Sequence, residues 1–109
     1  MRPLLQLTAL ALVPLACAVA IAASPSAVTV AIDSFAFDPP TVTVPAGATV
    51  TWVNHDDIPH LVAADDRSFK SPPMDTDDRY AMTFAKPGTY AYFCTLHPHM
   101  TGTVVVTAP

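Results

Sequence analysis

The sequence predicts an all-β protein, a sandwich of two antiparallel sheets with seven to eight short strands. Two observations lead to this prediction. Beyond residue 27, apolar residues alternate with polar ones in several short runs, which is typical of half-buried strands. Clusters of Pro, Gly and Asp separate these runs at regular spacing, as in a sandwich. No window of helical period and length appears.

The first predicted strands lie within residues 28–53. Residues 28–37 form the earliest run, which an Asp-Pro-Pro sequence ends. In residues 41–53 every second residue is apolar on both sides of a Pro-Ala-Gly sequence. This segment therefore predicts two half-buried strands joined by a tight turn.

The second half of the chain predicts the remaining strands. Residues 80–84 and 89–94 alternate on either side of a Lys-Pro-Gly turn, and residues 101–107 form a β-branched strand. Another strand begins at residues 61–62. Residues 65–78 contain two adjacent prolines and are the least strand-like, so we expect a surface loop that crosses between the sheets.

Residues 1–22 have the layout of a secretory signal peptide. Arg2 precedes a long run rich in Leu and Ala, and small residues follow at positions that suit a signal peptidase. We expect cleavage after residue 22, a short linker at residues 23–27 and one domain at residues 28–109. The chain has no twin-arginine pair, which predicts export as an unfolded chain to the periplasm or the cell exterior.

Two alternatives to a cleaved signal peptide remain open. An uncleaved membrane anchor is disfavoured by Pro3, Pro14 and the small residues that follow the apolar run. Lipoprotein processing before Cys17 is disfavoured because an aliphatic residue is expected where Pro14 stands. We expect contact with a membrane only through the signal segment.

The charge distribution excludes nucleic acid as a partner. The 109 residues carry 9 acidic and 5 basic side chains, and no basic cluster appears. All the acidic residues are Asp, and most lie in pairs in loop-like stretches, which is typical of solvated turns. The alternative is a negative rim that steers a positively charged partner.

Cleavage would leave Cys94 as the only cysteine of the domain. A domain of roughly 87 residues has a thin core and benefits from a staple. A single thiol in an exported protein is unpaired, reactive or held by another group. The alternative is a buried, inert cysteine.

The segment CTLHPHM, residues 94–100, suggests what holds this thiol. Gaps of two residues separate Cys94, His97 and Met100, so thiolate, imidazole and thioether can converge from one short loop. His60 follows a strand and a turn and is the best candidate for a fourth ligand. Two His, one Cys and a weak axial Met select copper and support one-electron transfer. Zinc, calcium, magnesium and iron–sulfur clusters prefer other ligand sets.

Two stretches of the sequence resemble the cupredoxin family of small blue copper proteins. They are WVNHDDIPH at residues 52–60 and KPGTYAYFCTLHPHMTGTVVV at residues 86–106, and the amicyanin-like, pseudoazurin-like and plastocyanin-like members are the most similar. The resemblance runs from about residue 28 to residue 107. It implies an eight-stranded Greek-key sandwich and one type 1 copper ion that cycles between Cu(I) and Cu(II). The ligands it implies are His60, Cys94, His97 and Met100.

The resemblance also assigns roles to residues around the metal. It implies that His97 presents its ring edge to an apolar surface as the exit for the electron. Tyr90 resembles the tyrosine corner that ties such sandwiches together. Leu61 departs from the pattern, because many members have Asn there, which braces the two ligand loops. His99 stands where amicyanin-like proteins have an apolar residue.

Several residues compete for places in this site. His99 is an alternative to His97, but it adjoins Met100 and neighbouring residues rarely reach the same metal, so we expect it at the surface. We expect His55 in a solvated turn and Met82 in the core. Met74 is expected to anchor the crossover loop.

The function predicted from the sequence is electron transfer. We expect a monomeric carrier that moves single electrons between redox proteins, such as a dehydrogenase, a cytochrome or an oxidase, which dock around His97. We expect no catalysis, because no nucleophile has a positioned base and the site has no open coordination position. One alternative is a periplasmic protein that stores or delivers copper. The other is a metal-free interaction module, which would make the four ligand types coincidental.

Overall fold

A computed structural model describes residues 3, 9, 11–12 and 26–109. Within these ranges the chain forms eight strands and no helix, and therefore no helix that is long and apolar enough to cross a membrane. Most of the signal peptide predicted at residues 1–22 and most of the linker predicted at 23–27 lie outside the described residues. The first strand begins at Ala27.

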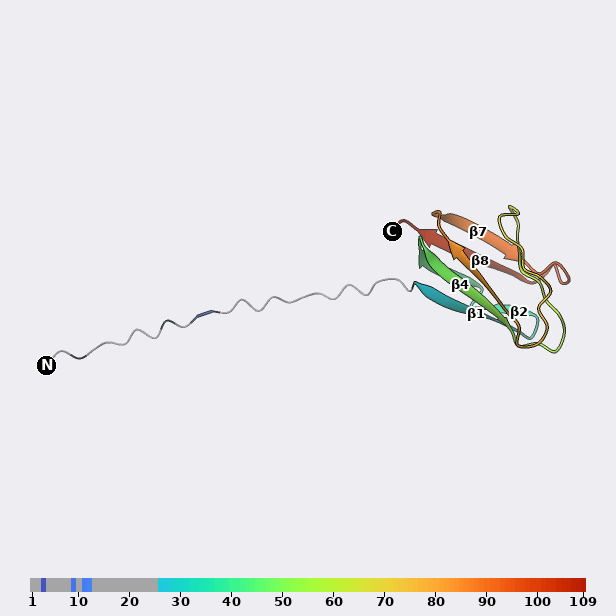
Figure 1. The fold of residues 1–109 in the computed structure, drawn as a ribbon, viewed down its shortest axis with the longest axis horizontal. Coiled ribbons are helices and arrows are strands. Elements are labelled where there is room, and N and C mark those ends of the chain that lie inside the picture. Colours follow the sequence, from blue (N-terminus) through green and yellow to red (C-terminus); the bar gives the residue numbers. More distant parts are fainter. Residues whose placement is uncertain (1–2, 4–8, 10, 13–25) are drawn as a thin grey trace.

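The strands form two four-stranded sheets that pack face to face (Figure 1). One sheet has the order β2-β1-β4-β6 and the other the order β3-β8-β7-β5. The strands are β1 (Ala27–Asp33), β2 (Ala36–Asp38), β3 (Thr41–Pro45), β4 (Ala48–Asn54), β5 (Ala63–Ala64), β6 (Arg79–Phe84), β7 (Gly88–Phe93) and β8 (Thr101–Thr107). The predicted β-sandwich is confirmed.

Two of the strand pairings are parallel, so the sheets are mixed rather than purely antiparallel. β1 pairs with β4 and β3 pairs with β8 in parallel. The turn between β3 and β4 explains this, because it carries the chain from one sheet to the other. The amide of Ala46 donates to Thr107 O at 2.8 Å in one sheet, and the amide of Gly47 donates to Phe84 O in the other at 2.6 Å. Gly47 has φ 91°, a left-handed conformation that favours glycine.

The run predicted as one strand at residues 28–37 is broken into two. Ser34 and Phe35 have φ values of 50° and 60°, and they form the two-residue turn between β1 and β2. Asp33 pairs with Ala36 across this turn. Paired positive φ values match the right-handed twist of a hairpin, although Asn and Gly are the usual residues there.

The core lies between the two sheets and is rich in Val and aromatic residues. The alternation seen in the sequence places one side of each strand inside. In β3, for example, Val42 and Val44 are buried, whereas Thr41 and Thr43 are exposed. Trp52 is fully buried, and its ring packs against Tyr80, Tyr92 and Phe69. Met82 packs against the core as predicted.

The segment 65–78 crosses from β5 in one sheet to β6 in the other, as predicted, but it is not wholly superficial. Phe69, Ser71 and Met74 are buried. Ser71 Oγ accepts a hydrogen bond from Val62 N at 2.8 Å, and Met74 exchanges two backbone hydrogen bonds with His60. This loop therefore anchors the segment that precedes β5.

Both ends of the folded domain lie against the turn between β3 and β4. Ser26 O accepts from Thr49 N at 2.9 Å, and Thr107 O accepts from Ala46 N at 2.8 Å. The loop of residues 94–100 lies at the opposite end of the sandwich (Figure 1). The sandwich therefore separates its termini from that loop.

The hydroxyl of Tyr92 is buried and has no hydrogen-bond partner. Burial raises the pKa of Tyr92 to about 12, and the nearby Trp52 indole offsets this only in part because no hydrogen bond of good geometry joins them. An unfolded tyrosine titrates near 10. The unfolded state therefore releases a proton at a lower pH than the folded state.

We expect Tyr92→Phe to reduce alkaline destabilisation. In the parent protein the free energy of unfolding should fall by about 1.4 kcal/mol per pH unit between pH 10 and 12, because the unfolded phenol ionises first. The variant should lose this contribution, and at pH 7 it should be at least as stable as the parent because it lacks a buried hydroxyl without a partner. Denaturant unfolding at pH 7, 10 and 11 measures the difference. Equal declines in the two proteins would contradict the assignment.

Gly102 faces the ring of Tyr92 across the β7–β8 pair. A Cβ atom at residue 102 would overlap this buried ring, which has no space to move. We expect Gly102→Ala to lower the free energy of unfolding by about 1–3 kcal/mol, the usual cost of overpacking. Thr101→Ala, at an exposed position of the same strand, is the control. Equal stabilities of the two variants would show that the Tyr92 ring can move to accommodate the added methyl group.

Candidate metal centre

Cys94 directly follows β7 and continues its buried face. Tyr92 and Cys94 are 1% and 0% exposed, whereas Phe93 between them is only half-buried. The strand period of two residues therefore directs the Cys94 side chain into the sandwich. Cys94 is a free cysteine within the described part of the chain.

The loop after Cys94 is closed by three backbone hydrogen bonds. His97 N donates to Cys94 O at 3.2 Å, and Met100 N donates to His97 O at 2.9 Å. Cys94 N donates to Met100 O at 3.0 Å. The spacing noted in the sequence thus corresponds to two successive turns, and each predicted ligand of the loop is bonded to the next.

His60 reaches the same place from the connection between β4 and β5. It is fully buried, and its backbone forms an isolated bridge with Met74 of the crossover loop. Leu61, the next residue, donates its amide to Cys94 Sγ at 3.5 Å. This backbone contact persists although Leu61 lacks the side-chain amide that many cupredoxins have there.

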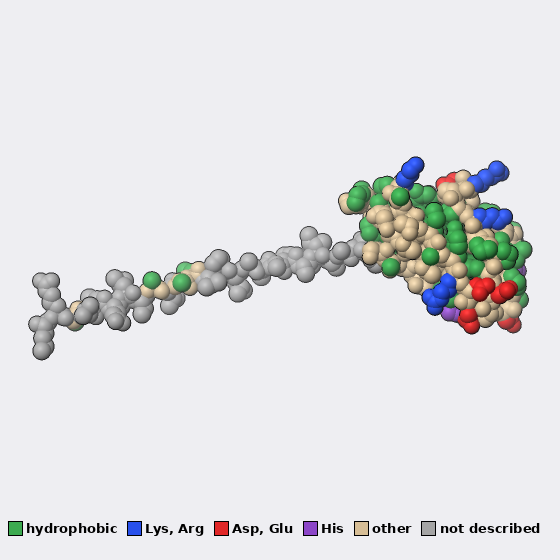
Figure 2. All heavy atoms as spheres, viewed as in Figure 1, with side chains coloured by type: hydrophobic (Ala, Val, Ile, Leu, Met, Phe, Trp, Pro, Cys, Tyr) green, Lys and Arg blue, Asp and Glu red, His purple; other side chains and the backbone are tan. Residues whose placement is uncertain are grey.

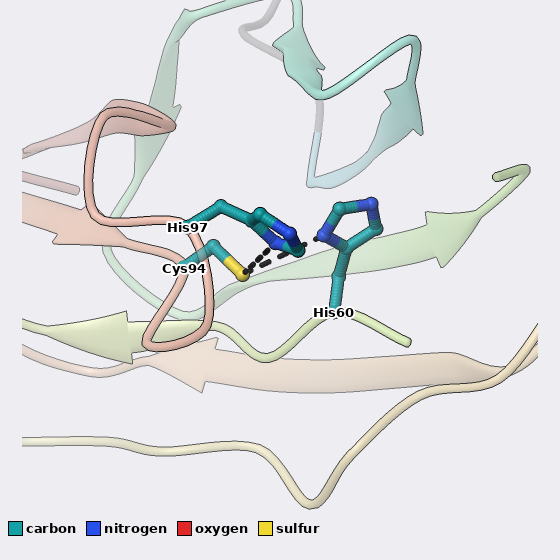
Figure 3. A group of neighbouring side chains, drawn as sticks. All are labelled: His60, Cys94 and His97. Carbon is teal, nitrogen blue, oxygen red and sulfur yellow. Dashed lines mark hydrogen bonds between the residues drawn. The ribbon is translucent and has the colours of Figure 1, made fainter. Parts of the chain in front are cut away.

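His60, Cys94 and His97 meet at the end of the sandwich (Figure 3). One possible ligand atom from each lies within 4.8 Å of the others. Cys94 Sγ is 3.6 Å from His60 Nδ1 and 3.8 Å from His97 Nδ1. Both imidazoles thus present the same nitrogen to one sulfur.

The Met100 backbone is bonded to Cys94, whereas the other candidates lie outside this group. Met100 is 5% exposed and belongs to the core cluster that includes Cys94. His99 and His55 are exposed, and neither joins the metal-binding group found among the described residues. Met74 is buried and holds the His60 backbone, as expected of a loop anchor.

Asp56 is a functional residue that the sequence analysis missed. Its Oδ2 accepts a hydrogen bond from His60 Nε2 at 2.8 Å. An ionised carboxylate can only accept, so the proton of the ring resides on Nε2 and the Nδ1 lone pair is free. The spacing Asn54-His55-Asp56 offered a signal, since Asp56 N donates to Asn54 Oδ1 at 2.9 Å in an Asx turn.

The pKa of Asp56 follows from its partners. Burial acts to raise the pKa of this carboxyl group, whereas hydrogen bonds from the Phe35 amide, the His60 ring and the Ser34 amide lower it. The balance leaves the pKa below its ordinary value, so the group is ionised near neutral pH. This negative charge lies next to a histidine that has no other polar partner on its Nε2 atom.

Asn54 supports the loop that carries Asp56. It is fully buried at the end of β4, and its side-chain amide donates to Ile58 O and to Met74 O, both at 2.9 Å. The β4–β5 connection and the crossover loop are therefore fixed to each other. Together these two segments hold the backbone of His60 in place.

Phe35 is a second residue that the sequence analysis missed. Its ring packs edge-on against His60 at 5.7 Å and against His97 at 5.2 Å, measured between ring centroids. It is nevertheless 54% exposed, as is Leu96. No local signal in the sequence predicted this contact, because Phe35 belongs to a turn far from both histidines in the chain.

The residues present suit a copper ion. Blue-copper sites use one thiolate, two imidazoles and a weak thioether, and a closed Zn²⁺ site would not use the thioether. Cys94, His60 and His97 offer the first three donors within 4.8 Å of one another, and Asp56 fixes the tautomer of His60. No other group of His, Cys and acidic residues with this geometry occurs among the described residues.

Tyr90 has the structural role that the resemblance implied. Its hydroxyl donates to Lys86 O at 2.8 Å, four residues earlier in the chain. This bond fixes the turn before β7 and hence the approach to Cys94. It is the geometry of a tyrosine corner.

Comparison with known proteins agrees with this site. A family model described as copper binding proteins of the plastocyanin/azurin family matches residues 25–107. The amicyanin of Paracoccus versutus is 44% identical over an alignment of 85 positions that covers 73% of this chain and 64% of that protein. The chain thus covers slightly less than two thirds of the length of this relative.

Solved structures share the fold. A purple cupredoxin from Nitrosopumilus maritimus is 32% identical, with a TM-score of 0.70 over 73% of this chain and 99% of the other. A copper-containing nitrite reductase from Thermus scotoductus is 33% identical, with a TM-score of 0.72, but only 23% of that chain is covered. Since the family model spans most of the sequence and the site holds the donor types of blue copper proteins, the chain belongs to the plastocyanin/azurin family of copper-binding proteins, the cupredoxins.

Proposed function

We propose that this protein is an exported type 1 copper protein that carries single electrons between redox partners. The proposed ligands are His60, Cys94, His97 and Met100. The observation that carries the proposal is the placement of Cys94 Sγ at 3.6 and 3.8 Å from two imidazole Nδ1 atoms. Such an arrangement needs only small shifts to surround one ion.

The proposed electron transfer depends on how firmly the surrounding residues hold the candidate ligands. Bound copper supplies a one-electron couple between Cu(I) and Cu(II). Cys94 offers a thiolate that is shielded from water and accepts a hydrogen bond from the Leu61 amide. Asp56 keeps the proton of His60 on Nε2. Because three loop hydrogen bonds and the Asn54 side chain hold the ligands, little has to move when the charge changes.

His97 is the proposed exit for the electron. It is the only half-buried member of the group, whereas His60 and Cys94 are fully buried. Phe35 and Leu96, the two most exposed large apolar side chains of the described domain, are available beside it. We propose that a redox protein docks here, and that the protein acts as a monomer.

The surroundings favour a partner with positive charge. Figure 2 shows acidic side chains gathered at the end of the domain where histidine side chains also appear. Asp75, Asp77 and Asp78 belong to the crossover loop that is bonded to Asn54. A negative rim of this kind raises the association rate with a basic partner at low salt.

A carrier fits this site better than an enzyme. Four protein ligands would leave no position for a substrate. The similarity to a nitrite reductase covers only 23% of that chain, so it supports a shared copper-binding fold and not a shared reaction. We propose export through a signal peptide at residues 1–22 to the periplasm or cell exterior, where the domain at residues 28–109 binds copper.

One observation favours copper handling as a second candidate. Leu61 replaces the side chain that commonly braces the two ligand loops, so only its amide links the His60 segment to Cys94. A weaker brace would let the metal leave more readily. In that case the protein would store or deliver copper.

We expect the purified domain with one equivalent of Cu(II) to turn intensely blue through charge transfer from the Cys94 thiolate. Cys94→Ser should remove the band and keep the fold, because oxygen replaces the sulfur donor. Visible absorption and far-UV circular dichroism measure the two effects. His99→Ala, in the same loop but exposed, should remain blue, whereas His97→Ala should not keep the parent spectrum. A blue Cys94→Ser variant would refute the ligand set.

Carrier and handling functions predict opposite kinetics. For a carrier we expect rapid electron self-exchange between the Cu(I) and Cu(II) proteins and slow loss of copper to a chelator. Nuclear magnetic resonance line broadening in mixtures of the two forms measures exchange, and the fading of the blue band measures loss. Leu61→Asn tests the brace. If Leu61→Asn retains copper in the presence of the chelator and the parent protein loses it rapidly, the result supports copper delivery as the function of the native protein.

A further inference from the structure

The turn between β1 and β2 lies across both histidines of the metal group. Its residue Phe35 contacts the His60 ring at 5.7 Å and the His97 ring at 5.2 Å, and both contacts are edge-on, with interplanar angles of 89° and 80°. The two histidine rings are themselves 5.0 Å apart. One side chain from a third segment thus touches two proposed ligands that come from different loops.

A single carboxylate holds this turn in place. Asp56 Oδ1 accepts from Ser34 N at 2.7 Å, and Asp56 Oδ2 accepts from Phe35 N at 3.0 Å. The same Oδ2 accepts from His60 Nε2 at 2.8 Å. The side chain of Asp56 is only 10% exposed. The carboxylate therefore joins the turn to a proposed ligand.

The conformation of the turn requires such a clasp. Ser34 and Phe35 both have positive φ, although neither is Gly or Asn. Non-glycine residues in this region cost energy and persist where the surroundings impose them. Two successive amides that converge on an ionised carboxylate provide charge-assisted hydrogen bonds, which are the stronger kind.

A role as an exposed apolar side chain does not by itself explain the position of Phe35. Leu96 has the same 54% exposure and lies in the loop of residues 94–100, next to His97 in the chain. Phe35 instead reaches both histidine rings from a separate turn. An exposed aromatic side chain that served only as docking surface would need neither a turn with positive φ nor a carboxylate that holds the turn in place. The geometry therefore indicates a role toward the ligands.

We propose that Asp56 and Phe35 form one strap that positions both histidines. Asp56 orients His60 and fastens the turn, and Phe35 then covers His60 and limits rotation of the His97 ring away from Cys94. The strap slows the departure of the metal and keeps water from its ligands, a role that rests on the proposed copper site. Both are positioning residues, and neither is a ligand.

The first test uses the metal-free protein, so its outcome is independent of copper binding. Asp56→Asn should speed hydrogen exchange of the Ser34 and Phe35 amides by about tenfold or more, because an amide side chain cannot replace all three bonds of the carboxylate. Both Asp56→Asn and Phe35→Ala should increase the mobility of the His97 ring in nuclear magnetic resonance relaxation. Unchanged exchange or an unchanged His97 ring would overturn the proposal.

The second test measures copper transfer from the loaded protein to an excess of chelator. Asp56→Asn and Phe35→Ala should each speed the loss about 10- to 100-fold, the usual effect of residues that support metal ligands. The double variant should lose copper no faster than the faster single variant, because both changes disable the same strap. Multiplicative effects would overturn the proposal.

Matched controls separate the strap from general surface effects. Leu96→Ala removes an equally exposed apolar side chain, and Asp57→Asn removes an exposed acid that has no side-chain hydrogen bond among the described residues. Both should stay within about twofold of the parent, the size expected of surface changes. Phe35→Ala that behaves like Leu96→Ala would refute the strap. A parent protein without a blue band would refute the copper proposal instead, and the metal-free test would still decide the strap.

Discussion

The pairing of β7 with β8 is the constraint on which the metal site depends. Phe93 is paired with Thr101, so the seven residues between them must close within the width of one strand pair. Two successive turns achieve this closure, one from Cys94 to His97 and one from His97 to Met100. The register of β7 and β8 therefore sets where the loop with the candidate ligands begins and ends. A shift of the register by one residue would also reverse which side chains face the core.

One acidic side chain, Asp56, dominates the electrostatics of the site. His60 and Cys94 are fully buried, and no Asp, Lys or Arg side chain of the described residues is buried with them. Asp56 lies at the margin, where burial is incomplete and three hydrogen bonds keep its charge stable. Placing the carboxylate at the imidazole and not at the sulfur leaves the thiolate free of a repelling neighbour.

The sequence predicted what depends on local periodicity. The alternation in residues 41–44 and the spacing of Cys94, His97 and Met100 each lie within a few residues, so strands and candidate ligands could be identified. The parallel pairings could not, because alternation looks the same whichever sheet a strand joins. Asp56 was missed for a similar reason. Its amide partners are 21 and 22 residues away, and only the folded chain shows that they meet.

The location of the chain ends has a consequence for how this domain can be combined with others. Ser26 and Thr107 both lie against the turn between β3 and β4, at the end of the sandwich remote from the ligand loop. A tether or a further domain attached at either point would leave the face around His97 open. The position of its ends would thus allow the same domain to act alone, to be attached to a membrane or to form part of a larger polypeptide without covering this face. The copper-containing nitrite reductase shares this fold over only 23% of its chain.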